Sequence, residues 1–226
     1  MARQYKRFQH KYYGENKYQR KTATKHGREI VKPIDKQDYA EMIRLCLIHR
    51  DEAKNQKEYY RWYRNYILLT VGVNTGNRIT TIIEQIPRDY AGGKYTVTEH
   101  KTGKRQQYSL NQDVYQIVKR YIEEFDLGFN EFMFKKDINS NEAITRMGVW
   151  KMIKQLAKEA GIEYPVACHS LRKSYGRWIW DETHDLLLVQ SLLMHDSAEE
   201  TMRYICLESN EIDEARSQIA HLTRYE

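Results

Sequence analysis

The feature that most constrains the fold is a helical repeat of apolar residues, which is clearest between residues 144 and 160. Apolar side chains recur there every three or four residues, at Ile144, Met147, Trp150, Ile153, Leu156 and Ala160. This spacing places one apolar stripe along a helix, and Gly161 follows as a residue that commonly ends one. We therefore predict an amphipathic helix that packs this stripe against the core.

The same periodicity occurs in most of the chain. Residues 32–54 predict a helix with Asp35 as its N-cap, and its buried stripe contains Tyr39, Met42, Ile43, Leu45 and Cys46. A second helix covers residues 58–73, and the turn-forming residues 74–77 end it. We expect five further helices. One covers residues 112–125, one begins near His169, a buried one covers 185–195, one follows the capping residue Ser197, and the last covers 210–224.

One region changes from the helical period to alternation. Tyr95 and Val97 alternate with polar neighbours, Thr102 and Gly103 supply a turn, and residues 105–110 return. Alternation around such a turn predicts a β-hairpin, with lysines near its tip. The fold class that we expect is therefore mostly α with a small antiparallel β-sheet, an α+β arrangement.

The positive charge is concentrated at the N-terminus. Residues 1–32 contain ten Lys and Arg but two Asp and Glu, out of 37 and 31 in the whole chain, so the net charge of +6 originates there. Five aromatic residues lie among these bases, at Tyr5, Phe8, Tyr12, Tyr13 and Tyr18. This mixture suits contacts with phosphates and stacking on bases, although a solvated tail has the same composition. We predict a flexible, basic, aromatic-rich segment over 1–32 and a folded domain over 33–226.

If the basic segment binds nucleic acid, particular lysines and arginines are expected to contact phosphates. The predicted contacts are Lys6, Arg7, Lys11, Arg20 and Lys21, together with Lys104 and Arg105 of the hairpin. Such contacts supply affinity and position without reading base identity.

Several classes of protein are disfavoured by composition. No run approaches the eighteen or so apolar residues of a membrane span, and the basic N-terminus lacks the apolar centre of a secretory signal. Three cysteines, Cys46, Cys168 and Cys206, form no disulfide framework. We expect reduced thiols in a cytoplasmic protein without a membrane partner.

Cofactor chemistry also finds little support. Cys168, His169, His195 and Cys206 are residue types that bind zinc, but they lack the closely spaced ligand pairs of structural zinc sites. No Walker motif or dinucleotide-binding glycine fingerprint is present. We predict no metal and no cofactor.

Six residues with charged or reactive side chains follow one another along the folded domain. They are Arg78, Lys101, His169, Arg172, His195 and Tyr204. Each has an ordinary explanation, such as a solubilising cation, a histidine at a helix C-terminus or a tyrosine in the core. His169 and Arg172 are three residues apart and therefore share one face of a helix. Their order along the chain is more informative than any one of them.

The ordered set resembles the catalytic constellation of the tyrosine recombinase (phage integrase) family. In that family an arginine follows a TG-x-R turn, a lysine lies on a β-hairpin, and H-x-L-R precedes G-H-x8-Y. Here TGNRITTI supplies Arg78, EHKTGKRQQYSL supplies Lys101, CHSLRKSYG supplies His169 and Arg172, and LLMHDSAEETMRYI supplies His195 and Tyr204. The resemblance covers the catalytic domain, about residues 35–206.

The resemblance implies a site-specific DNA recombinase or integrase that breaks and rejoins duplex DNA through a 3′-phosphotyrosyl intermediate. Tyr204 would be the nucleophile and His169 its proton acceptor. Lys101 would protonate the leaving 5′ oxygen, and His195 would donate to the scissile phosphate. The bond energy would be kept in the phosphotyrosyl link, so religation would require no ATP. The arginines would neutralise the phosphate, so no metal would be required.

Elementary chemistry explains why these residue types are needed together. The phosphorane that forms during phosphodiester exchange carries extra negative charge, and Arg78 and Arg172 would grip it with forked, permanently charged donors. Each preorganised donor is typically worth about 3 to 4 kcal/mol. Forming a tyrosine phenolate at pH 7 costs about 4 kcal/mol, because its ordinary pKa is about 10.

The chain departs from the family pattern in three places. Thr81 occupies a position that is usually a carboxylate, and Met194 replaces the glycine that usually precedes the second histidine. Family members usually add a helical core-binding domain of about a hundred residues, where this chain has its basic segment. Two interpretations follow: a catalytic fragment, or a minimal recombinase whose basic segment is the second jaw around DNA. Met1 mildly favours a complete chain.

Two rival functions share the same residues. A DNA-binding regulator without turnover would keep the fold, but the intact set of six argues against it. A type IB topoisomerase-like enzyme would relax supercoils as a monomer, but the spacing of the second histidine and the tyrosine favours a recombinase. As a recombinase the protein would act as a homotetramer on paired DNA sites, associated with the nucleoid. Helix 210–224 would pack either on a neighbouring subunit or on its own core.

Overall fold

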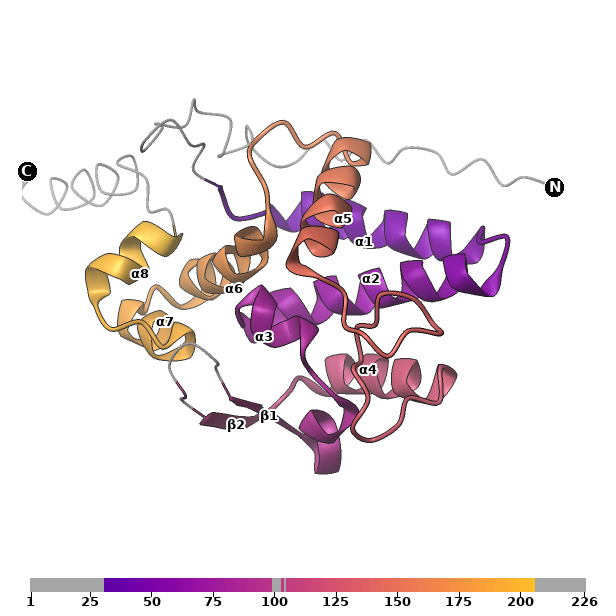
Figure 1. Cartoon of the computed structure of the whole chain (residues 1–226). Helices are drawn as coiled ribbons and strands as arrows, with labels where there is room; N and C mark the ends of the chain where they lie inside the picture. Colours follow the sequence, from indigo (N-terminus) through magenta and orange to yellow (C-terminus); the bar gives the residue numbers. More distant parts are fainter. Residues whose placement is uncertain (1–30, 99–102, 104, 206–226) are drawn as a thin grey trace, which may run out of the picture.

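A computed structural model describes residues 31–98, 103 and 105–205 of the chain. Figure 1 shows a mostly helical molecule with one small hairpin at its edge. The helices are α1 (Lys36–Asp51), α2 (Gln56–Thr75), α3 (Ile79–Ile83), η1 (Pro87–Gly93, a 3₁₀ segment), α4 (Gln112–Glu124), α5 (Arg146–Glu159), α6 (Cys168–Thr183), α7 (Leu186–Leu193) and α8 (Ala198–Ile205). The strands are β1 (Lys94–Thr98) and β2 (Arg105–Ser109).

The central helix is α2, which packs against α1, α4 and α6. It begins at the N-cap Asn55, whose side chain accepts a hydrogen bond from the backbone of Glu58. Its contact with α6 is close at Gly72, where an added Cβ would lie 2.7 Å from Cδ1 of Leu171. A glycine at this position therefore allows α2 to approach the helix that carries His169 and Arg172.

The predicted hairpin is confirmed as an antiparallel pair in which Tyr95 lies opposite Tyr108. Tyr95 is fully buried, and its hydroxyl oxygen accepts a hydrogen bond of 2.6 Å from Nδ2 of Asn77. Because Asn77 precedes Arg78, this bond attaches the hairpin to the turn that carries the first predicted catalytic arginine. Lys101 and Lys104 lie outside the described residues.

Two of the predicted buried faces are partly wrong. In α5, Met147 is 59% exposed and Trp150 is 40% exposed. The buried face is formed by Val149, Met152, Ile153, Leu156 and Ala157. The helix and the burial of Ile153 and Leu156 were predicted correctly, but the buried face is rotated toward Val149 and Met152, so Met147 and Trp150 lie at its exposed edge.

Helix α7 is also not the buried helix that its composition predicts. Leu187 is 74% exposed, and Val189 and Leu193 are the buried residues of this helix. Figure 1 shows α7 beside α6 and α8 at the end of the molecule, so it packs on one side only. Its apolar character therefore does not correspond to complete burial.

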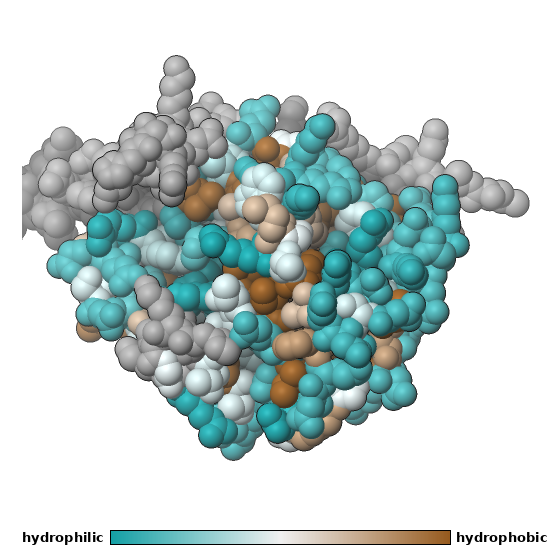
Figure 2. Space-filling model, in the orientation of Figure 1, coloured by the Kyte–Doolittle hydropathy of each residue, from teal (hydrophilic) through white to brown (hydrophobic). Residues whose placement is uncertain are grey.

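The remaining predictions concern surfaces and termini. Figure 2 shows a mainly hydrophilic face with a band of apolar atoms down its middle. Cys46 and Cys168 are buried free thiols. Among the helices that the structure describes, none combines the length and apolarity of a membrane span. Three predicted features lie outside the described residues: residues 1–30 of the basic segment, Cys206, and the helix over 210–224.

Candidate active site

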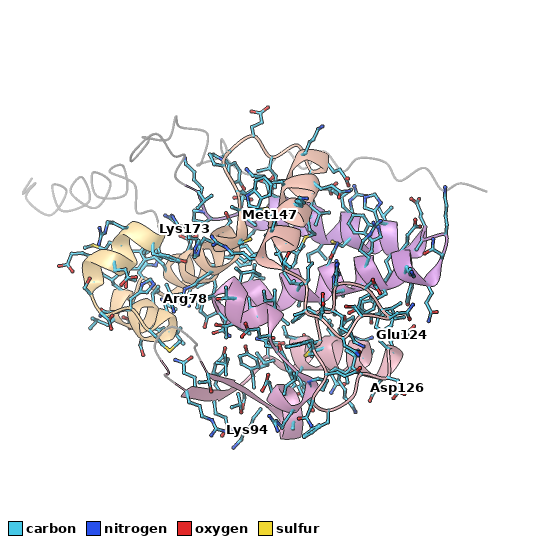
Figure 3. The ribbon with its side chains drawn as sticks, viewed as in Figure 1. Arg78, Lys94, Glu124, Asp126, Met147 and Lys173 are labelled. Carbon is cyan, nitrogen blue, oxygen red and sulfur yellow. The ribbon has the colours of Figure 1, made fainter. Side chains whose placement is uncertain are left out.

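Five of the six predicted catalytic residues lie within the described structure, and they converge from separate elements. Arg78 is the N-cap of α3, His169 and Arg172 lie on α6, His195 follows α7, and Tyr204 lies on α8. Figure 3 shows the labelled Arg78 in the region between α3, α6 and α7. The sixth residue, Lys101, lies outside the described residues.

Arg172 connects two helix ends beneath this cluster. Its side chain is buried, and Nη1 donates a hydrogen bond of 2.8 Å to the carbonyl oxygen of Gly76. Nη2 donates to the carbonyl oxygen of Leu193. Both carbonyls lie at helix C-termini, of α2 and α7, where the helix dipole is negative and favours a cation. Arg172 therefore ties together the turns that precede Arg78 and His195.

The turn before Arg78 requires a glycine. Gly76 has a φ of +62° and caps the C-terminus of α2, and an added Cβ would lie 2.2 Å from the ring of Tyr175. A side chain here would be excluded by backbone conformation and by space. The turn delivers Arg78 in an extended conformation at the start of α3.

The nucleophile candidate faces a histidine. The hydroxyl oxygen of Tyr204 lies 3.4 Å from Nδ1 of His169. Desolvation, followed by the charges of Arg146, Arg172 and other neighbouring cations, lowers the pKa of His169 below its ordinary value. The imidazole is therefore neutral at pH 7, so Nδ1 can accept the hydroxyl proton.

Tyr204 is surrounded by cations and by a second histidine. The guanidinium carbon of Arg172 lies 5.8 Å from the centre of the tyrosine ring, and the His195 ring packs edge-on at 4.9 Å. Burial raises the pKa of Tyr204, and the charges of Arg172 and Arg78 oppose this increase. Because the pKa of Tyr204 remains above its ordinary value, the hydroxyl keeps its proton at rest. A base must remove this proton before the oxygen can act as a nucleophile.

His195 is buried and held by the first turn of α8. Its Nδ1 lies 3.1 Å from the hydroxyl of Thr201, and its Nε2 lies 3.8 Å from a carboxylate oxygen of Glu200. Desolvation lowers the pKa of His195 to about 4, so the ring is neutral at pH 7. The predicted cap of this helix is present, since Ser197 Oγ accepts the backbone N–H of Glu200 at 3.1 Å.

A small second hydrophobic core holds α8, the helix on which Tyr204 lies. Val189, Leu193 and Ile205 are buried together, and Tyr204 packs against this cluster. Gly176 of α6 allows the approach, because an added Cβ would lie 2.9 Å from Cδ1 of Leu193. The packing of α7 and α8 on α6 therefore sets the position of the tyrosine relative to His169.

The two departures from the family pattern within this region have different consequences. Thr81 is buried, and its backbone N–H donates to the carbonyl of Arg78 at 2.9 Å. Because its side chain is a hydroxyl, no carboxylate is present at this position. Met194 has a φ of +53° and caps α7 in the left-handed region. That conformation favours glycine, so the methionine is held there at a steric cost.

Sequence reasoning missed three residues of this region: Thr201, Lys173 and Arg146. Thr201 touches His195, and Lys173 lies near Tyr204. Lys173 is adjacent to the H-x-L-R motif, which was a usable signal. Arg146 carries no such signal, because its charge reaches His169 only through the packing of α5 against α6.

Most of the predicted nucleic-acid contacts are not described. Lys6, Arg7, Lys11, Arg20, Lys21 and Lys104 lie outside the described residues. Arg105 is exposed at the first position of β2. Within 31–98, 103 and 105–205, no three histidine, cysteine or acidic side chains gather as metal ligands.

Comparison with known proteins identifies a family and related folds. Residues 55–211 match the model of the phage integrase family. The "Probable integrase/recombinase YoeC" of Bacillus subtilis (strain 168) is 27% identical over 186 residues, which cover 80% of this chain and 92% of that protein. Tyrosine recombinase XerD of Listeria innocua is 28% identical over 146 residues, which cover 62% of this chain and 49% of that protein.

Solved structures share the fold at low identity. The XerA recombinase superimposes with a TM-score of 0.66 at 19% identity, over 88% of this chain and 68% of that chain. The XerH site-specific recombinase, in a post-cleavage complex with its difH substrate, gives a TM-score of 0.63 at 21% identity, over 82% and 52%.

The chain thus spans nearly all of one relative and about half the length of the XerD relatives that it matches. The mostly helical fold with an antiparallel hairpin is confirmed. The motif resemblance is confirmed as well: the chain belongs to the phage integrase family.

Proposed function

We propose that this protein is a site-specific DNA recombinase or integrase that cleaves and rejoins duplex DNA through a 3′-phosphotyrosyl bond to Tyr204. The observation that carries the proposal is the Tyr204 hydroxyl 3.4 Å from the neutral His169, with the guanidinium of Arg172 beside it. The names of the relatives, integrase/recombinase and tyrosine recombinase, support the same activity.

We propose the following cleavage step, in which Lys101 has the role that the family resemblance implies. The Tyr204 oxygen attacks the scissile phosphorus as its proton passes to Nδ1 of His169. The bond from phosphorus to the 5′ oxygen breaks, and Lys101 supplies the proton that makes the leaving group a hydroxyl. In rejoining, the 5′ oxygen of the incoming strand attacks the phosphorus as its proton returns to Lys101. The bond from phosphorus to the Tyr204 oxygen breaks, and His169 returns the proton to that oxygen.

Arg78 and Arg172 stabilise the charge that develops on the phosphate. A guanidinium has five N–H donors, and the two bonds of Arg172 to Gly76 and Leu193 leave others for phosphate oxygens. Because those carbonyls fix the guanidinium before substrate arrives, little reorganisation is required in the transition state.

His195 is proposed as a neutral donor to the same phosphate. The Thr201 hydroxyl lies 3.1 Å from both Nδ1 of His195 and the carbonyl oxygen of Ser197. The hydroxyl has one proton: when it donates to the Ser197 carbonyl it accepts from Nδ1–H of His195, and when it donates to Nδ1 the neutral ring carries its proton on Nε2. Thr201 therefore selects the tautomer that donates to phosphate only when its hydroxyl turns from Ser197 to Nδ1.

The partners follow from the reaction. Strand exchange between two duplexes requires a homotetramer on paired sites, and the proposed setting is the nucleoid of the cytoplasm. The basic segment 1–32 is proposed as a second DNA-binding element beside the catalytic domain, 33–226. A silent regulator or a type IB topoisomerase-like enzyme would bind DNA too, but the relatives are named recombinases, which favours strand exchange.

Covalent trapping tests the proposal. The wild-type chain and Tyr204→Phe are incubated without metal with nicked suicide duplexes prepared from a fragmented genomic pool. An adduct that survives denaturation and requires Tyr204 is expected, and sequencing the trapped DNA gives the site. DNA binding without any adduct would favour the silent regulator. A relaxed supercoiled plasmid without exchange between two sites would favour the topoisomerase-like reading.

A further inference from the structure

Lys173 follows Arg172 on α6 and has an unusual environment for a lysine. Its side chain is buried, with 7% of the residue exposed. Its Nζ donates a hydrogen bond of 2.8 Å to the carbonyl oxygen of Val31 and lies 5.5 Å from the centre of the Tyr204 ring. Figure 3 shows the labelled Lys173 between α6 and α8, on the same side of the molecule as Arg78.

Burying an ammonium is costly unless nearby dipoles or negative charge compensate. The Val31 carbonyl provides one such dipole, and the face of the Tyr204 ring provides a second, weaker attraction. A tyrosine oxygen that becomes a phenolate would add a full negative charge nearby. The buried charge of Lys173 is therefore best compensated in the state that attacks the phosphate.

The carbonyl that holds Lys173 is itself fixed. Residues 31–34 form a strap along α6, in which the backbone N–H of Ile34 donates to Ser174 Oγ at 2.7 Å. Trp178 Nε1 donates to the Ile34 carbonyl at 3.2 Å, and Lys32 N–H donates to the Pro165 carbonyl at 2.9 Å. The strap therefore places the Lys173 ammonium at a defined position before DNA binds.

We propose that Lys173 is a positioning residue of the cleavage reaction, which acts through Tyr204 by holding a fixed positive charge over its ring and favouring the phenolate. The inference rests on the proposed function, in which Tyr204 is the nucleophile. In this step the hydroxyl proton still passes to His169. The charge of Lys173 contributes to the lowered pKa of His169, so it keeps the ring neutral before the reaction and opposes protonation of the ring during it.

Other charged and titratable groups also face Tyr204, so the effect of Lys173 has to be separated from theirs. They are His169 and Arg172 on α6, Arg78 at the start of α3, His195 after α7, and Glu200 on α8. None of these is changed in the variants below.

The test measures single-turnover formation of the Tyr204 adduct on saturating nicked suicide duplex, between pH 6 and pH 9. Lys173→Gln keeps a hydrogen-bond donor for Val31 but removes the charge, and Lys173→Arg keeps the charge. Lys119→Gln removes a lysine from the exposed face of α4, where it pairs with Glu123 at 3.5 Å, and is the matched control.

We expect Lys173→Gln to slow cleavage about tenfold at pH 7, equivalent to about 1.4 kcal/mol. The deficit should stay about constant from pH 6 to pH 9, because Tyr204, whose pKa lies above its ordinary value, is protonated at rest in both proteins over this range. Lys173→Arg should cleave within about threefold of the wild-type rate, and the control Lys119→Gln should cleave at the wild-type rate. Lys173→Met is measured in parallel, with thermal unfolding of every variant, so that a folding defect in one variant does not decide the result.

Three results would overturn the inference. Lys173→Gln with the wild-type rate would show that the charge is dispensable. A deficit that Lys173→Arg shares in full would indicate a structural role in holding the strap. An absence of adduct from the wild-type chain would remove the proposed function itself, and this inference with it.

Discussion

Nη1 of Arg172 donates a hydrogen bond of 2.8 Å to the carbonyl oxygen of Gly76, ninety-six residues earlier in the chain. The same guanidinium bonds to Leu193, the last residue of α7. One side chain therefore connects the turn before Arg78 with the turn before His195. In the proposed reaction, this side chain both contacts the phosphate and sets the spacing of its neighbours.

Arg172→Lys should therefore lose both functions. A single ammonium cannot donate in the directions of two carbonyls and a phosphate, so we expect cleavage to fall at least about a hundredfold. A carbonyl left without its donor should also lower the free energy of unfolding by about 1 to 3 kcal/mol. Adduct formation and urea denaturation measure the two effects.

The matched control for this substitution is Arg120→Lys. Arg120 is exposed on α4 and bonds only within its own helix turn among the contacts described here, to the Gln116 carbonyl at 3.3 Å. This variant should keep wild-type activity and stability. Full activity in Arg172→Lys would contradict the proposed clamp.

Thr201→Val should slow cleavage by about tenfold, because valine has nearly the same size but cannot hydrogen-bond to Nδ1 of His195 in either direction. Thr201 is fully buried and its hydroxyl lies 3.1 Å from the Ser197 carbonyl as well as from His195, so a loss of about 1 kcal/mol in stability is expected too. Thr201→Ser retains the hydroxyl and should retain most of the activity. Equal rates for the valine and serine variants, measured by adduct formation, would argue against tautomer selection.

Met194→Gly should stabilise the protein. The residue adopts a φ of +53°, which costs a non-glycine residue about 1 to 2 kcal/mol, while the greater freedom of glycine when unfolded offsets about half of that. A gain of about 0.5 to 1 kcal/mol corresponds to an increase of roughly 2 °C in Tm. Calorimetry measures it, and Lys119→Gly, within a regular helix, should shift Tm in the opposite direction.

Stability should fall between pH 6.5 and pH 4 because of His195. Its pKa is about 4 in the folded protein, against an ordinary value of about 6.5, so the unfolded chain binds more protons in this window. Unfolding is then favoured as the pH falls, by up to about 3 kcal/mol for this group. The lowered pKa of His169 acts in the same direction.

The comparison that isolates this effect is His195→Gln. Thermal denaturation at pH 7 and pH 4.5 should show a smaller loss of stability in the variant than in wild type. Identical losses in the two proteins would mean that His195 does not titrate in this window.

Deletion of residues 1–30 should weaken DNA binding, because most of the positive surplus of the chain lies there. Phosphate contacts release counterions, so the slope of log affinity against log salt should become shallower in the deleted protein. Fluorescence anisotropy over a salt series measures the slope for both proteins. An unchanged slope would show that the segment makes no phosphate contacts.

Local patterns in the sequence determined much of the architecture. The Asp35 cap specifies a helix start, the turn at Gly76 specifies a helix end, and the alternation around Tyr95 specifies a strand. Each of these features depends on neighbouring residues alone. The order of the charged residues also indicated the site, because the spacing between His195 and Tyr204 lies within one short segment. These features depend on backbone conformation and on contacts between near neighbours.

The tertiary structure decided what depends on packing between distant segments. Apolar composition predicts that a helix has an apolar face, but the neighbouring elements determine which row is covered, so Met147 and Leu187 are exposed. The ammonium of Lys173 reaches both Val31 and Tyr204 only because α6 packs against the strap on one side and α8 on the other. A periodic pattern contains no information about such distances, which are set when the helices assemble.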